Sequence, residues 1–146
     1  MKQEENIKLT GNLTIVLNRE NGTKDVYEHK NLVVTTGKNF IASRMKDTTD
    51  AAMSHMAIGS GNTAAAAGDT ALGTQLDIQS LTSTTVSTNT VTYAATFGAG
   101  NGTGAVAEAG VFNASSSGTM LCRSVFSVVN KAAGDSMTVT WVITIS

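Results

Sequence analysis

The segment Ser136-Met137-Thr138-Val139-Thr140-Trp141-Val142-Ile143-Thr144-Ile145-Ser146 alternates apolar and polar side chains with a period of two residues. Five of its apolar residues, which include the single tryptophan of the chain, fall on one side of an extended backbone, and threonines fill most of the other side. Because successive side chains of a strand point to opposite faces, this pattern predicts a strand with one dry face and one wetter face. The segment carries no catalytic group, so it indicates a β-built structural or binding module rather than an enzyme.

Similar alternation of β-branched and aromatic residues recurs along the chain and predicts about eight strands. The strands are expected at residues 7–17, 24–30, 53–59, 76–86, 90–97, 105–112, 119–129 and 136–146. The turns between most of them are short, which favours antiparallel neighbours. We therefore expect an all-β fold, an antiparallel β-sandwich with jelly-roll-like character.

The first two predicted strands flank Asn21-Gly22, the dipeptide that most strongly predicts a tight hairpin. Charged residues are dense in the second of these strands, as is typical of an edge strand that must not pair with other chains. Val26 is the residue of that strand that we expect to face the core.

One short helix is predicted at about residues 37–46. Thr35 or Thr36 could cap its first turn, and Phe40, Ile41, Arg44 and Met45 follow the spacing of a helix face. We expect this helix to cover an open end of the sheets.

The chain has 146 residues, which favours one domain, at residues 7–146, preceded by a polar N-terminal arm at residues 1–6. Only 14% of the residues are charged, against about a quarter in a typical soluble protein. Threonine, serine and asparagine take the place of charge, which predicts a hydroxyl-rich β surface.

Charge and targeting patterns exclude several classes of partner. The net charge is −1, and the lysines and arginines are spread among acids, so we expect no nucleic acid to bind. No apolar run is long enough to span a bilayer, and residues 1–6 lack the apolar core of a secretory signal. We expect synthesis in a cytoplasm and no membrane partner. Cys122 is the only cysteine and is expected to be a small buried apolar residue.

Familiar catalytic and metal motifs are missing from the sequence. The glycines of residues 98–104 lack the spacing of a dinucleotide fingerprint, and no Gly-x-Ser-x-Gly motif occurs. His29 and His55 are not in a metal-binding spacing, and Asp47 and Asp50 do not form a calcium loop. We expect no catalytic residue, no metal and no cofactor.

Glu108 is the one acid inside a strand of small residues. It either points to solvent or pairs with a basic group such as Arg123. A glycan hydrolase that uses Glu108 or Asp77 is the enzymatic alternative, but a lone carboxylate without an acid–base partner does not hydrolyse glycosides.

Residues 59–73 form a glycine- and alanine-rich segment that no periodicity assigns to a helix or strand. Long loops in compact domains are often functional, so this one is a candidate contact surface together with the N-terminal arm. The partner-binding residues that we predict are Lys2, Glu4, Glu5, Asn62, Thr63 and Asp69.

Four short motifs from Asn31 onward resemble those of one group of proteins. They are residues 31–38 (NLVVTTGK), 56–64 (MAIGSGNTA), 68–73 (GDTALG) and 108–113 (EAGVFN). In this order they resemble small virion structural proteins of tailed bacteriophages, described as capsid decoration (cement) proteins or as tail-fibre-like proteins.

The resemblance implies a non-enzymatic protein on the capsid exterior of a virion, made in the bacterial host cytoplasm. Its implied partners are the major capsid protein, whose subunits it would bridge, and further copies of itself as a dimer or trimer. The alternative is a tail, tail-fibre or baseplate component that acts as a binding module for tail proteins or a host surface glycan.

Overall fold

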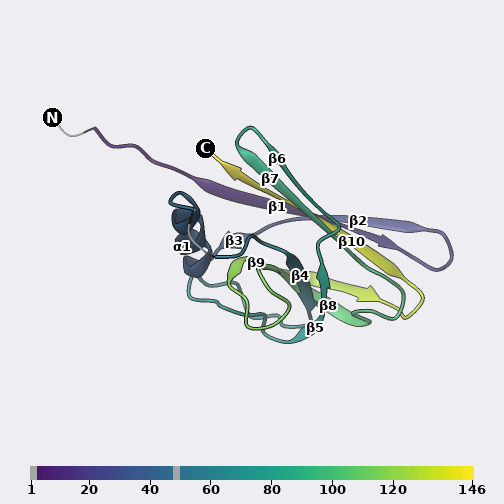
Figure 1. The fold of residues 1–146 in the computed structure, drawn as a ribbon. Coiled ribbons are helices and arrows are strands. Elements are labelled where there is room, and N and C mark those ends of the chain that lie inside the picture. Colours follow the sequence, from purple (N-terminus) through teal and green to yellow (C-terminus); the bar gives the residue numbers. More distant parts are fainter. Residues whose placement is uncertain (1–2, 48–49) are drawn as a thin grey trace.

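The computed structural model describes residues 3–47 and 50–146, which fold into two antiparallel sheets packed face to face (Figure 1). The first sheet has the order β2 (Lys24–Lys30), β1 (Leu9–Asn18), β10 (Ser136–Ile145), β7 (Thr90–Phe97), β6 (Ser83–Ser87). The second has the order β3 (Leu32–Val33), β9 (Met120–Lys131), β8 (Gly104–Phe112), β4 (His55–Gly59), β5 (Gln75–Ser80). The prediction of an all-β antiparallel sandwich is confirmed.

The C-terminal strand β10 is the central strand of the first sheet. It pairs along its whole length with β1 and along most of it with β7. Trp141 lies opposite Leu13 on one side and Tyr93 on the other, and its side chain is completely buried. The apolar face predicted from the alternation is therefore the floor of the core.

The second sheet supplies the other half of the core. Met56, Ile58, Val111 and Cys122 are all completely buried in the same apolar cluster as Trp141. Burial raises the pKa of the Cys122 thiol well above its ordinary value, so the thiol stays protonated at neutral pH. The expectation that Cys122 is a small buried apolar residue is confirmed.

The predicted strand at residues 76–86 is wrong in one respect: it is two strands, β5 and β6, in different sheets. The chain turns a corner between them. The Leu81 N–H donates to the Ser54 carbonyl beside β4, whereas the Thr82 N–H donates to the Ala94 carbonyl in β7. Consecutive residues thus bond to opposite sheets, which a pattern of apolar and polar residues along one strand does not reveal.

The first hairpin forms at Asn21-Gly22 as predicted, with Gly22 at a φ of +89°, and β2 is an edge strand. The prediction that Val26 faces the core is wrong, because its side chain is 61% exposed. Tyr27 and His29 face inward instead, and they lie opposite Ile15 and Leu13 of β1. Because successive side chains of a strand point to opposite faces, this register turns Val26, which lies opposite Val16, to the outer face of the sheet.

The strand predicted to begin at residue 7 begins at Leu9, and Ile7 is 77% exposed. Residues 3–8 are exposed and lead away from the sandwich (Figure 1). Two backbone hydrogen bonds between Lys8 and Ser146, with N···O distances of 2.6 and 2.9 Å, anchor the base of this arm.

The helix α1 (Thr35–Arg44) begins two residues earlier than predicted and packs against β9. Neither threonine caps it: the N-cap is Val34, which makes no side-chain hydrogen bond, and the Thr36 hydroxyl donates to the Met120 carbonyl. Gly37 is buried at the contact, where an added Cβ would overlap the carbonyl oxygen of Leu121. The helix can lie this close to β9 only because residue 37 has no side chain.

Replacing Gly37 with alanine should therefore destabilise the protein, although alanine is the better helix former. The Cβ must push α1 away from β9, and overpacking of this kind costs about 1–3 kcal/mol. Gly68→Ala is the control, because a Cβ there meets nothing within 4 Å. Urea unfolding of the two variants measures the difference, and equal midpoints would contradict this account of α1.

Candidate functional site

Residues 60–74, between β4 and β5, lie on the outer face of the second sheet. In β8 and β9 the residues Ala109 and Cys122 point to the core between the sheets, and their neighbours Glu108 and Arg123 point to the opposite face. Both of these charged side chains are buried, at 0% and 3% exposure, because the loop covers them.

The Glu108 carboxylate accepts three backbone hydrogen bonds from the two ends of the loop. Its Oε1 accepts hydrogen bonds from the backbone N–H groups of Gly61, at 2.9 Å, and Thr74, at 2.8 Å. Its Oε2 accepts one from the N–H of Gly73, at 2.9 Å. One carboxylate therefore ties both ends of the loop to the centre of the sheet.

Arg123 connects that carboxylate to the middle of the loop. Its Nε and Nη2 donate to Glu108 Oε2 at 3.0 and 2.9 Å, and its Nη1 donates to Asp69 Oδ2 at 2.7 Å. Nη2 also donates to the Thr63 carbonyl, and the Ala66 N–H donates to the Asp69 carboxylate. We call Glu108, Arg123 and Asp69 the loop clamp.

Glycine is required where the loop passes over Glu108. A Cβ at Gly59 or Gly61 would lie 2.6 or 2.5 Å from Glu108 Oε1, closer than such atoms approach. The glycines of residues 59–61 and Glu108, which belong to two of the motifs that carry the resemblance, are thus parts of one structural unit.

The clamp holds Glu108 as an ionised acceptor. Burial alone would raise its pKa, but hydrogen bonds from Thr74, Gly73, Arg123 and Gly61 outweigh burial and lower it below the ordinary value. The pKa of Asp69 is also lowered, chiefly by the hydrogen bond from the Ala66 N–H. A carboxylate saturated with donors is poorly placed to give or take a proton, so the arrangement anchors the loop.

Apolar contacts add to the clamp beneath the loop. Leu72 of the loop packs against a small buried cluster that is separate from the main core and that includes Ala57 and Phe112. The loop is therefore a third layer of the protein.

The predicted partner-binding residues fall in three environments. Asn62 and Thr63 are exposed on the loop, and Glu4 and Glu5 are exposed on the arm. Asp69 is engaged within the chain, because its carboxylate is ion-paired with Arg123. Lys2 lies outside the described residues.

Two shallow grooves bring the loop and the base of the arm to one surface. One groove, of about 340 Å³, includes Asn62 of the loop, and the other, of about 380 Å³, includes Ile7 of the arm. Both grooves include Asn31 and Leu32, so they lie on either side of β3. We call these two grooves and the residues between them the β3 surface. The sequence predicts the loop and the arm as separate contact segments, but no motif in it indicates that they lie on the same surface.

Asn31 has an unusual place at the centre of the β3 surface. Its carboxamide lies directly against Gly11, where an added Cβ would overlap it, and its backbone N–H donates to the Gly11 carbonyl. The carboxamide oxygen and nitrogen are both buried and have no hydrogen-bond partner among the described residues. Leaving such groups unpaired inside a protein is costly.

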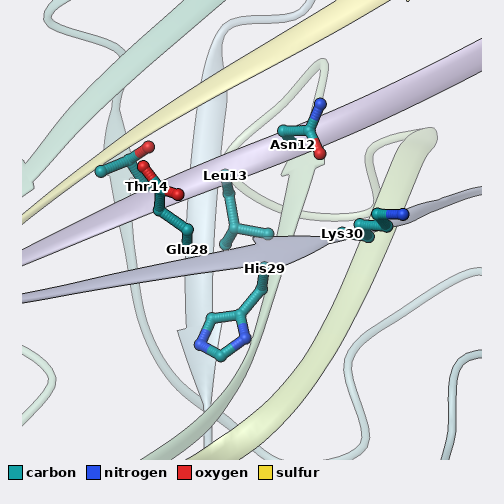
Figure 2. Close-up of a pocket in the computed structure, with 6 residues that line it drawn as sticks. All are labelled: Asn12, Leu13, Thr14, Glu28, His29 and Lys30. Carbon is teal, nitrogen blue, oxygen red and sulfur yellow. The ribbon is translucent and has the colours of Figure 1, made fainter.

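A third groove, of about 370 Å³, lies on the edge of the first sheet (Figure 2). No motif in the sequence indicates it. It is lined by Asn12, Leu13, Thr14, Glu28, His29 and Lys30. The His29 ring turns away from the Asn12 side chain and stacks on Phe126, with ring centroids 4.8 Å apart, and burial lowers its pKa. Across residues 3–47 and 50–146, no group of three or more histidine, cysteine or acidic side chains could hold a metal ion.

No protein-family model matches the chain, and no similar curated protein or solved structure is found. None of the helices in the described ranges is both long enough and apolar enough to cross a bilayer.

The clamp should contribute strongly to stability. Glu108→Gln removes the charge that Arg123 and three backbone N–H groups share, and breaking a buried ion pair from one side costs about 3–5 kcal/mol. Glu28→Gln, at an exposed carboxylate of β2, is the matched control and should change stability little. Hydrogen exchange at Gly61, Gly73 and Thr74 should accelerate only in the first variant. Unchanged exchange at these three amides would contradict the clamp.

Stability should also fall in acid, and the clamp should account for part of the loss. The pKa of Glu108 is lowered in the folded protein from an ordinary value of 4.5, so its stabilisation is present above about pH 4.5 and is lost as the pH falls through the lowered value. Urea unfolding between pH 7 and pH 3 should show the gap between wild type and Glu108→Gln narrowing toward pH 3. A gap that is constant over this range would mean that Glu108 titrates normally.

Proposed function

We propose that this protein is a non-enzymatic capsid decoration (cement) protein of a tailed bacteriophage, which binds neighbouring major capsid protein subunits on the capsid exterior and bridges them. The resemblance of its motifs to such proteins is the first support. The second is the β3 surface, where a clamped loop borders one groove and an extended arm borders the groove next to it. This juxtaposition carries the proposal.

The loop and the arm suit different parts of such a contact. The clamp holds the loop at several points, so the loop loses little conformational freedom when a partner binds. The arm, residues 3–8, is exposed and can lie along a neighbouring subunit, at the entropic cost of ordering it. A preformed patch with an exposed extension can bridge two subunits whose spacing is set by the shell.

The surface chemistry is compatible with a rigid protein partner. Asn62 is exposed in the groove that contains Asn31, and Thr63, its neighbour in the chain, is also exposed. Leu32 is 37% exposed and Ile7 is 77% exposed, so the surface mixes apolar and hydrogen-bonding groups, as protein interfaces do.

The proposal predicts that binding to heads depends on the β3 surface. Removal of residues 1–6 and the substitution Asn62→Arg should each weaken binding of the purified protein to heads that lack it by roughly tenfold or more, the effect of losing one important interface contact. Asn101→Arg, at an exposed residue that lines neither groove, should bind as wild type does. Co-sedimentation with the heads measures all four proteins.

Gold labelling of the virions distinguishes head from tail. Label on heads together with the loss of binding in both variants supports the proposal. Label confined to tails or fibres would overturn it in favour of the tail-component alternative. Equal binding of all four proteins to heads would overturn the assignment of the contact to the β3 surface.

A further inference from the structure

The strand β6 is an edge of the first sheet without any charge. All of its residues, Ser83–Ser87, are exposed, and Val86 is 71% exposed. No charged side chain occurs anywhere between Asp77 and Glu108. Edge strands of soluble proteins usually carry charges that prevent pairing with other chains, so β6 lacks the common protection.

The opposite edge of the same sheet shows the contrast. In β2 the side chains of Lys24, Glu28 and Lys30 are exposed along the edge. One sheet thus has a charged edge and an uncharged one, and the difference arises within a single layer of the fold.

The backbone of β6 can accept a further strand. Within the described part of the chain it pairs with β7 alone, and alternate residues of such an edge strand direct their N–H and C=O groups outward. Val86 lies opposite Val91, which packs on the main core, so Val86 faces the side of the second sheet. The hairpin of β6 and β7 projects beyond that sheet, and this leaves the valine uncovered (Figure 1).

We propose that β6 pairs with β6 of a second copy of this chain, antiparallel, about a two-fold axis at Thr85. In this register Thr84 of one copy lies opposite Val86 of the other, and Ser83 lies opposite Ser87. No charges meet, β-branched side chains face one another, and the same patch serves both copies, as two-fold symmetry requires. The first sheet of one copy and the first sheet of the other, with five strands each, become one continuous sheet of ten strands.

Self-pairing favours β6 over β2 for a direct reason. A two-fold axis at Tyr27 would set Lys24 of one copy opposite Lys30 of the other and Val26 opposite Glu28. Like charges directly opposite each other destabilise a strand pair. Pairing β2 in this register sets like charges against each other, whereas pairing β6 about Thr85 sets none.

The two copies of Val86 are diagonal neighbours across the axis on the same face of the joined sheet, and long side chains at such positions can reach each other.

A five-residue pairing buries less area than a standard interface of about 1,200–2,000 Å², so we expect dissociation constants in the micromolar range. This inference concerns the protein alone and does not depend on binding to a capsid.

Sedimentation equilibrium on the full chain, from micromolar to near-millimolar concentration, tests the proposal. Wild type should be a monomer–dimer mixture, and Val86→Lys and Val86→Glu should each weaken the dimer by about tenfold or more, because like charges then meet across the axis. An equimolar mixture of the two variants should recover dimer, as lysine and glutamate become neighbours. Val26→Lys, at an exposed valine of the other edge strand, should dimerise as wild type does.

Circular dichroism checks that each variant is folded, which the exposure of both valines favours. A wild-type monomer at all concentrations would overturn the proposal. So would a dimer or trimer that survives Val86→Lys, one that is lost in Val26→Lys, or one that is lost only when residues 1–6 are removed. Failure of the mixed variants to recover dimer would exclude the two-fold register.

Discussion

The ion pair between Glu108 and Arg123 is the interaction on which the outer layer of this protein depends. Both side chains are buried on the face of the second sheet that would otherwise meet water. Charges in such a place are tolerated only when they are paired and fully hydrogen-bonded, and here the backbone of residues 60–74 supplies the remaining donors. The loop therefore stabilises the buried charges of the sheet, and those charges in turn hold the loop in place.

That dependence explains the composition of the loop. Its glycines admit the carboxylate, Asp69 takes the outer side of the guanidinium, and Leu72 covers a small apolar cluster. What is left on the outside, including Asn62 and Thr63, is exposed on a backbone held from beneath. A surface of this kind binds with little ordering cost, which is the physical basis of the proposed role in bridging capsid subunits.

The two edges of the first sheet are governed by a different constraint, the exposure of unpaired backbone groups. At both edges the chain crosses between the two sheets: it leaves the first sheet after β2 to form β3, and it enters the first sheet again at β6 after β5. The charges of β2 protect the first edge, and the β6 edge is uncharged. An oligomer built on β6 would leave the β3 surface, which lies at the edge of the second sheet, available to another partner.

The sequence by itself determined the class of fold, because period-two alternation in segments such as β10 has one physical solution, a strand with one buried face. It also determined the hairpin at Asn21-Gly22, the short helix that follows residue 34, and the burial of Trp141 and Cys122. These features depend on neighbours in the chain or on the hydrophobicity of single residues, so they can be recognised locally.

Only the tertiary structure decided which sheet each strand joins and which residues meet. The division of residues 76–86 between two sheets, the inward turn of His29 in place of Val26, and the close contact of α1 with β9 at Gly37 all depend on partners far away in the sequence. The same holds for the ion pair between Asp69 and Arg123, which are 54 positions apart in the sequence. From the sequence, Glu108 could either point to solvent or pair with Arg123. In the folded protein the loop covers both side chains and they pair. Only the tertiary structure could decide this, because burial and pairing depend on segments that are far apart in the sequence.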